Sequence, residues 1–253
     1  MRGVKYMKLR IKFKKYGPVR FIGHLDVMRF FQKAIRRAGI DVTYSTGFSP
    51  HQVMSFAAPL GVGLTSNGEY MDIQVNSLPA PKDGLTACQV LVEQLNAASV
   101  RGLDVVSARV LPETAGNAMA SVTAASYTVR FREGREPQIT MGDSGILEAV
   151  NSFLAKDEIM ITKETKKGTR EINLRPGIYE LNWEGDAFYM LVDASSAGNI
   201  KPIQVIAAFL ADCGETLKEN ALLITREDVF TDKFISLGEI GWDHPDTESG
   251  GVR

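Results

Sequence analysis

The spacing of apolar residues in the first 111 positions alternates between the period of a strand and the period of a helix. Residues 8–15 alternate apolar side chains with Lys or Arg, which predicts a half-buried strand with a basic outer face. Residues 24–38 place apolar side chains at intervals of three and four and end at Gly39, which predicts an amphipathic helix. The other predicted elements are strands at 42–45, 53–57, 70–75 and 103–111, a hairpin turn at Asn67-Gly68 and a helix at 85–97.

The same order of elements repeats in the second half of the chain. A strand, a helix, two strands, a helix and a strand make up the split βαβ arrangement. The pattern therefore predicts an α+β protein of two tandem ferredoxin-like domains, the second with at least one extra strand. Its predicted elements are strands at 127–132, 158–165, 171–174, 178–183, 188–192 and 222–225, and helices at 146–154 and 202–210.

These elements divide the chain into four parts. Residues 1–111 form the first domain, which has a basic N-terminal face, and residues 112–123 form a linker. Residues 124–230 form the second domain. Residues 231–253 are expected to be a polar, partly disordered tail.

Composition narrows the class of protein. The chain has 253 residues, of which 44% are hydrophobic and 23% charged, with two cysteines. These values are typical of a globular protein and exclude a disulfide scaffold, a collagen-like chain and a disordered charged tail. No segment approaches the ~20 consecutive apolar residues of a membrane span, and no apolar signal-peptide core follows the N-terminus. We therefore expect a cytoplasmic protein without membrane contact, with Cys88 and Cys213 as buried free thiols.

The charge is concentrated at the N-terminus. Residues 1–40 contain twelve Lys or Arg and one acid, Asp26, so this segment carries +11 while the whole chain carries −1. Such asymmetry favours contact with a polyanion, most often a nucleic acid. The alternative is that these cations solubilise one face and pair with acids from the rest of the chain.

A set of cations on the predicted helix 24–38 is the best candidate for an RNA-binding surface. A solvated helix face rarely carries four cations with no acid among them. Two nearby rings can stack on bases, although each ring taken alone is more often a core residue. The predicted RNA-binding residues are Arg29, Lys33, Arg36, Arg37, Tyr44 and Phe48.

No motif in the chain spells out a reaction. The three histidines lack the spacing of a zinc site, and we find no nucleophile motif, no phosphate-binding Gly-rich loop and no cysteine cluster for iron and sulfur. We therefore predict no metal and no cofactor. Weak catalytic candidates are Arg20, which suits a phosphate beside a helix N-terminus, and His24 and His51, which suit proton transfer. In the alternative interpretation His24 caps the helix and residues 47–51 form a stiff turn.

Six segments of the chain form a recognisable set: residues 19–26 (VRFIGHLD), 37–40 (RAGI), 44–51 (YSTGFSPH), 55–63 (SFAAPLGVG), 68–73 (GEYMDI) and 170–176 (REINLRP). These segments resemble the radical-SAM-associated domain of unknown function, a bacterial family. The similarity runs from about Met7 to about residue 215. Gln52 stands where Pro often follows the His, and Asn173 stands where Asp is usual, which argues against an essential carboxylate at position 173.

The resemblance implies a bacterial cytoplasmic protein that stands alone or is fused behind a cobalamin-binding-type radical SAM protein. In that family the gene often lies near those of an RNase E/G-type ribonuclease and of ribosomal proteins. No activity is established for the family, so it transfers no catalytic residue. Because the chain lacks clustered cysteines, it can only assist a radical SAM enzyme.

The leading hypothesis is an accessory module that presents an RNA or a ribosome-related ribonucleoprotein to a partner radical SAM protein. A second hypothesis is a metal-independent endoribonuclease similar to the CRISPR repeat enzymes, with His24 and His51 as the acid–base pair and Arg20 holding the phosphate. A third is a pure protein-interaction module, in which the basic face meets an acidic partner subunit.

Overall fold

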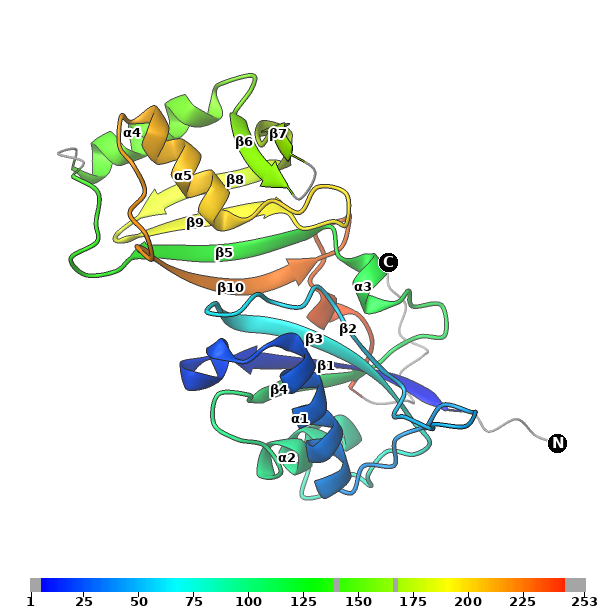
Figure 1. The fold of residues 1–253 in the computed structure, drawn as a ribbon. Coiled ribbons are helices and arrows are strands. Elements are labelled where there is room, and N and C mark those ends of the chain that lie inside the picture. Colours follow the sequence, from blue (N-terminus) through cyan, green and yellow to red (C-terminus); the bar gives the residue numbers. More distant parts are fainter. Residues whose placement is uncertain (1–5, 139–141, 166–167, 244–253) are drawn as a thin grey trace. The chain divides into compact units, whose positions relative to one another are not determined.

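The computed structural model of the chain (Figure 1) describes three stretches, residues 6–138, 142–165 and 168–243. Contacts divide the chain into two compact units, which we call unit 1 (residues 1–122 and 230–253) and unit 2 (residues 123–229). The predicted polar tail therefore groups with unit 1 as far as it is described. Its last part, which includes His244 and most of the expected disorder, lies outside the described residues.

Unit 1 is built from a small antiparallel sheet with two main helices on one face (Figure 1). Its elements in chain order are β1 (Met7–Lys15), η1 (Gly17–Phe21), α1 (His24–Arg37), β2 (Met54–Phe56), β3 (Thr65–Val75), α2 (Ala87–Ala97), β4 (Val105–Val110), α3 (Ala118–Ser121) and η3 (Leu237–Glu239). The strand order is β4-β1-β3, β2 also pairs with β3, and these pairings are all antiparallel.

The core of unit 1 lies between this sheet and the helices α1 and α2. Alternation along β1 buries Leu9, Ile11 and Phe13 on the helix side, as the sequence pattern predicts. The rings of Phe13 and Phe31 of α1 meet edge-on with centroids 4.7 Å apart. Such a pair adds about 0.5–1.5 kcal/mol to the stability beyond the burial of apolar area.

The opposite face of the unit 1 sheet is covered by the chain itself. Arg10, on the outer side of β1, is only 2% exposed and donates two hydrogen bonds to the Asp72 carboxylate of β3, at 2.8 and 2.9 Å. The same carboxylate accepts the Ala118 N–H of α3 at 3.1 Å, and the Tyr70 and Ser236 hydroxyls lie 3.2 Å apart. The predicted basic outer face of β1 is therefore in part a buried ion pair beneath α3 and the C-terminal segment.

The C-terminal segment of unit 1 packs closely on this face. Leu237 of η3 is fully buried, and Val110 and Trp242 exchange backbone hydrogen bonds of 2.7 and 2.9 Å. At Gly241 the backbone has φ +99°, and a Cβ there would lie 2.3 Å from the Val110 carbonyl oxygen. Glycine is therefore required for the segment to approach β4 this closely.

Two local predictions in unit 1 are wrong. Asn67-Gly68 is not a hairpin turn: it lies inside β3, at an irregularity in the pairing with β1. There the Ser66 hydroxyl accepts the Gly68 N–H at 3.1 Å, so a local side-chain bond satisfies the backbone. Residues 42–45, predicted as a strand, make only isolated bridges.

Unit 2 has antiparallel strands, two helices and a separate hairpin (Figure 1). Its elements are β5 (Ala124–Phe131), α4 (Asp143–Leu154), β6 (Met160–Thr165), β7 (Gly168–Asn173), η2 (Arg175–Gly177), β8 (Ile178–Glu184), β9 (Ala187–Asp193), α5 (Pro202–Asp212) and β10 (Leu222–Phe230). The strand order is β10-β5-β9-β8, and β6 pairs with β7 alone. In the core, the Phe209 ring of α5 lies 5.7 Å from that of Phe153 and 5.3 Å from that of Phe188.

Both units combine helices with mostly antiparallel sheet, which confirms the α+β class. The finer assignment of two tandem ferredoxin-like domains stays a prediction. Within the described ranges, no helix has both the length and the apolar character needed to traverse a bilayer.

The buried ion pair allows a direct test of the cover on the unit 1 sheet. Asp72→Ala leaves the Arg10 guanidinium buried without an acid, so we expect the free energy of unfolding in urea to fall by about 3–5 kcal/mol. As a control, Asp186→Ala breaks an exposed pair with Arg130 (3.0 Å) and is expected to cost less than about 1 kcal/mol. Equal losses in the two variants would contradict the buried pair.

Candidate nucleic-acid interface

The four predicted RNA-binding cations of helix α1 lie on its exposed side. Their spacing of three and four residues keeps them on one face of the helix, opposite the buried side that packs on the sheet. All four of these side chains are exposed. We call Arg29, Lys33, Arg36 and Arg37 the α1 cations.

An acid shares the face of the α1 cations, so the argument that this face carries none is wrong. Asp26, in the first turn, lies 3.5 Å from the Arg29 guanidinium, and both side chains are more than half exposed. Such a pair contributes little energy and screens Arg29 only in part. Lys33 and Arg36, by contrast, have no ion-pair partner in the part of the chain that the structure describes.

Arg37 differs from the other α1 cations because its guanidinium is held in place. Its Nη2 donates a hydrogen bond of 2.7 Å to the carbonyl oxygen of Ala98, the residue that ends α2. The guanidinium carbon also lies 5.9 Å from the centre of the Phe30 ring. Arg37 therefore joins α1 to α2 while its side chain stays exposed.

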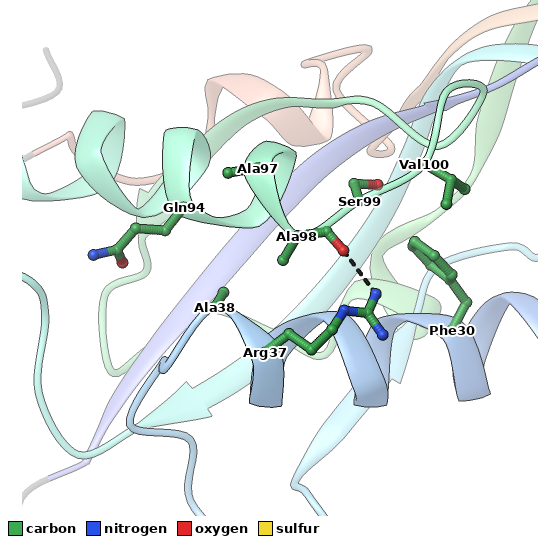
Figure 2. A pocket seen from close by; sticks show the side chains of 8 residues that line it. All are labelled: Phe30, Arg37, Ala38, Gln94, Ala97, Ala98, Ser99 and Val100. Carbon is green, nitrogen blue, oxygen red and sulfur yellow. Dashed lines mark hydrogen bonds between the residues drawn. The ribbon is translucent and has the colours of Figure 1, made fainter.

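An open groove of about 860 Å³ runs between the C-terminal ends of α1 and α2. Figure 2 shows Arg37 reaching across it from α1 to the Ala98 carbonyl, with Gln94 and Ala97 on the α2 side. The Phe30 ring lies on the side of Arg37 that is away from Gln94 (Figure 2). The groove is lined by Phe30, Arg37, Ala38, Gln94, Ala97, Ala98, Ser99 and Val100.

The two predicted stacking rings lie on an exposed loop. Tyr44 is half exposed at the base of the loop, in a bridge with Gln52, and Phe48 at residues 46–50 is wholly exposed. The Ser45 hydroxyl lies 2.9 Å from His51 Nδ1 and accepts the His51 N–H at 3.1 Å, which closes the loop. The Phe48 ring is therefore outside the core and accessible to a ligand.

This loop is fastened to α1 by Gln52. The Gln52 side chain is buried, and its Nε2 donates a hydrogen bond of 3.1 Å to the Gln32 carbonyl oxygen in the middle of α1. Its Oε1 is also buried and has no hydrogen-bond partner in the described structure. The rings of Tyr44 and Phe48 are therefore carried by a loop attached to the same helix as the α1 cations.

His24 faces the interior of unit 1. It is the first residue of α1 after the N-cap Gly23, so it does not cap the helix, and its ring meets that of Phe56 edge-on at 5.0 Å. His24 lines a cavity of about 10 Å³ together with the buried side chains of Lys15 and Glu69. A cavity of this size holds at most about one water molecule and excludes a nucleotide.

The structure does not bring His24 and His51 together. His51 precedes Gln52, which is bonded to Gln32, and Gln32 lies eight residues along α1 from His24. Eight residues correspond to about 12 Å along a helix axis. This separation along α1 argues against an acid–base pair in which both imidazoles contact one phosphodiester.

Arg20 lies in η1, just before α1. Its guanidinium carbon is 4.7 Å from the centre of the Phe21 ring, and its carbonyl oxygen accepts the Gly63 N–H at 2.8 Å. Arg20 Nε is buried and has no hydrogen-bond partner among the described residues. The Arg20 guanidinium thus packs against the Phe21 ring. Arg20 is near His24 in sequence, but in the described structure it forms no hydrogen bond with His24 or His51.

The segment of residues 170–176 plays a structural part in unit 2. Asn173 Oδ1 accepts the N–H groups of Ile159 and Arg175, both at 3.0 Å. The Arg175 guanidinium donates to the carbonyl oxygens of Leu154 at 2.7 Å and Ile178 at 3.2 Å. A carboxylate oxygen at position 173 would accept the same two bonds, so Asn and Asp are interchangeable in this role.

Sequence reasoning missed the groove between α1 and α2. Phe30 and Gln94 are 64 positions apart, and no motif links them. It also missed that Lys15 is buried, although alternation places position 15 on the same side of the strand as Leu9, Ile11 and Phe13. The Lys15 ammonium donates to the Ile22 carbonyl oxygen at 3.0 Å.

Neither a metal cluster nor a reactive thiol emerges from the described residues. They contain no group of three or more His, Cys, Asp or Glu placed to hold a metal ion. Burial raises the pKa of the Cys88 thiol to about 11, and burial, together with Asp212, also raises the pKa of Cys213. Both thiols are therefore poor nucleophiles at neutral pH.

Comparison with known proteins places the chain in a family. The profile described as "Uncharacterized protein conserved in bacteria (DUF2344)" matches residues 8–202. The chain therefore belongs to this bacterial family. No curated protein matches the chain. The association with radical SAM proteins implied by the sequence resemblance stays a prediction.

The thiols give a test of the packing in the two units. At pH 8 about one Cys88 thiol in a thousand is ionised in the folded protein, and the side chain is almost fully covered. We therefore expect iodoacetamide to alkylate the half-buried Cys213 well before Cys88, as measured by peptide mass spectrometry, and to alkylate both at similar rates in urea. Equal rates in the folded protein would contradict the burial of Cys88.

The separation of the histidines predicts the outcome of a nuclease assay. We expect RNA incubated with the protein in EDTA to remain intact, because the positions of His24 and of the Gln52–Gln32 bond along α1 argue against one phosphate contacting both histidines. The matched variants His24→Gln and His51→Gln are then indistinguishable from the unmodified protein on a denaturing gel. Cleavage that both variants lose would contradict this expectation.

Proposed function

We propose that the protein binds single-stranded RNA, or a ribonucleoprotein that exposes such RNA, on the outer face of α1 in unit 1. One observation carries the proposal. Lys33 and Arg36 are exposed and lack an ion-pair partner in the described structure, and the same helix holds the loop that exposes Tyr44 and Phe48. Cations that follow a backbone, with rings beside them, are the combination that single-stranded nucleic acids bind.

The covered face of the unit 1 sheet favours the helix face as the binding surface. Many small α+β domains bind single-stranded RNA on the open face of the sheet, through exposed rings. In unit 1 that face carries the buried Arg10–Asp72 pair and the fully buried Leu237, and Tyr70 is only 1% exposed. An RNA on that side would first have to displace the C-terminal segment.

The order of the elements supports the ferredoxin-like part of the proposal. In unit 1 the first and last strands, β1 and β4, are neighbours, and β3 lies on the other side of β1. In unit 2 the strand order β10-β5-β9-β8 follows the same rule, with the β6–β7 hairpin as an insertion. We therefore propose two tandem ferredoxin-like domains, each with its two helices in the two strand-to-strand connections.

The proposed partner is a radical SAM enzyme in the bacterial cytoplasm. This part rests on the resemblance of the sequence and on the absence of clustered cysteines, since the chain cannot hold the cluster that such chemistry needs. The protein would hold the RNA while the partner modifies or processes it. If the basic face instead meets an acidic protein, the RNA-binding assay below gives no signal.

The α1 cations can be tested by their effect on salt dependence. We expect Lys33→Gln with Arg36→Gln to weaken binding to a pool of short single-stranded RNAs, measured by fluorescence anisotropy. Each phosphate contact contributes about 0.7 to the slope of log affinity against log salt, so the loss of two contacts lowers the slope by about 1.4.

The matched control removes the same charge elsewhere in unit 1. Lys82 and Lys233 are exposed and belong to segments other than α1 and the loop of Tyr44 and Phe48, so Lys82→Gln with Lys233→Gln is expected to leave the slope unchanged. An equal fall in both double variants would show that only net charge matters. That result, or no binding of RNA by the unmodified protein, would overturn the proposed surface.

A further inference from the structure

We propose that the groove between α1 and α2 receives one unstacked base of the bound RNA. This inference rests on the proposed function, because it concerns the same helix and the same ligand. It adds a specific recognition site beside the α1 cations, at the end of the helix where Arg36 and Arg37 lie.

The guanidinium of Arg37 provides the flat surface. Its bond to the Ala98 carbonyl and its position over the Phe30 ring hold it in place between the two helices (Figure 2). Bases of single-stranded RNA stack on guanidinium planes as well as on aromatic rings. A surface held in this way loses little conformational freedom when a base covers it.

The remaining lining suits the edge of a base better than an apolar ligand. The Gln94 amide stands at the α2 side of the groove and offers both a donor and an acceptor. The Ser99 hydroxyl is already committed, since it donates to the Leu103 carbonyl oxygen at 2.5 Å. The small side chains of Ala97 and Ala98 leave room on the α2 side of the groove for a planar group to enter.

Charge determines which occupant fits. Arg37 belongs both to the groove and to the α1 cations, and Arg36 precedes it on the exposed face. A base in the groove thus brings its own phosphate next to cations that lack an acidic partner among the described residues. An apolar peptide would leave the guanidinium groups of Arg36 and Arg37 without an anionic partner. A nucleotide can stack its base on the Arg37 guanidinium and place its phosphate beside both cations.

Two variants test the groove without altering the net charge. Arg37→Lys keeps the positive charge but removes the plane, and Ala97→Leu fills the groove from an exposed position at the end of α2. Ala211→Leu, at an exposed position in the last turn of α5, is the matched control. The probes are a mixed-sequence RNA of about 12 nucleotides and an abasic oligoribonucleotide of the same length.

We expect the unmodified protein and Ala211→Leu to bind the RNA about tenfold more tightly than the abasic probe. In Arg37→Lys and Ala97→Leu this preference is reduced, because the base in the groove is lost while stacking on Tyr44 and Phe48 remains. The salt slope stays unchanged because the phosphate contacts remain. A 4-thiouridine in the RNA is expected to crosslink to peptides containing Phe30 or Val100 in the unmodified protein and in Ala211→Leu, but not in Arg37→Lys or Ala97→Leu.

Failure of the groove and failure of RNA binding give different results. If Lys33→Gln with Arg36→Gln lowers the salt slope but Arg37→Lys and Ala97→Leu keep the full preference for RNA over the abasic probe, the groove proposal is overturned and the α1 surface stands. If the unmodified protein binds neither probe, both proposals are overturned. Circular dichroism of each variant separates a loss of binding from a loss of fold.

Discussion

The buried pair of Arg10 and Asp72 is the interaction on which the arrangement of unit 1 depends. An isolated charge in a protein interior costs several kcal/mol, so each partner is tolerable there only because the other is present. The pair joins β1 to β3 and, through the Ala118 N–H, fixes α3 over the sheet. Once α3 and the C-terminal segment cover that side, the sheet face is no longer open to a ligand. The helix side of unit 1 is what remains, which is why the exposed cations of α1 acquire their significance.

The N-terminal charge therefore has two different physical uses. Arg10 and Lys15 are only 2% exposed, and each has a partner inside the protein: a carboxylate for Arg10 and a backbone carbonyl for Lys15. Lys33 and Arg36 stay in solvent. A count of +11 over residues 1–40 adds these groups together, although the charge of Arg10 is balanced by the Asp72 carboxylate. The long-range field of the segment is consequently smaller than its sequence charge implies, and its position on α1 matters more than its size.

Local periodicity predicted the main elements because it reflects contacts within a few residues. The alternation of β1 and the helical spacing of α1 are both found close to the expected positions. Features that need two distant segments were not accessible in this way. The irregularity at Asn67-Gly68 depends on pairing between β1 and β3, and turn chemistry alone gives the wrong answer there. The groove needs Phe30 and Gln94 to meet across two helices, and the small cavity beside His24 needs α1, β1, β2 and β3 to come together.

Arg37 shows that a structural role and a binding role need not be alternatives. A long side chain loses about 1.5–2 kcal/mol of rotamer entropy when it is fixed in one conformation. At an ordinary surface arginine that loss falls on the binding step. Here the bond to Ala98 and the contact with Phe30 already restrict the guanidinium when the protein folds. The contact that joins α1 to α2 therefore also holds the guanidinium plane in place for a ligand. The same hydrogen bond thus contributes both to the stability of the fold and to the affinity of the groove.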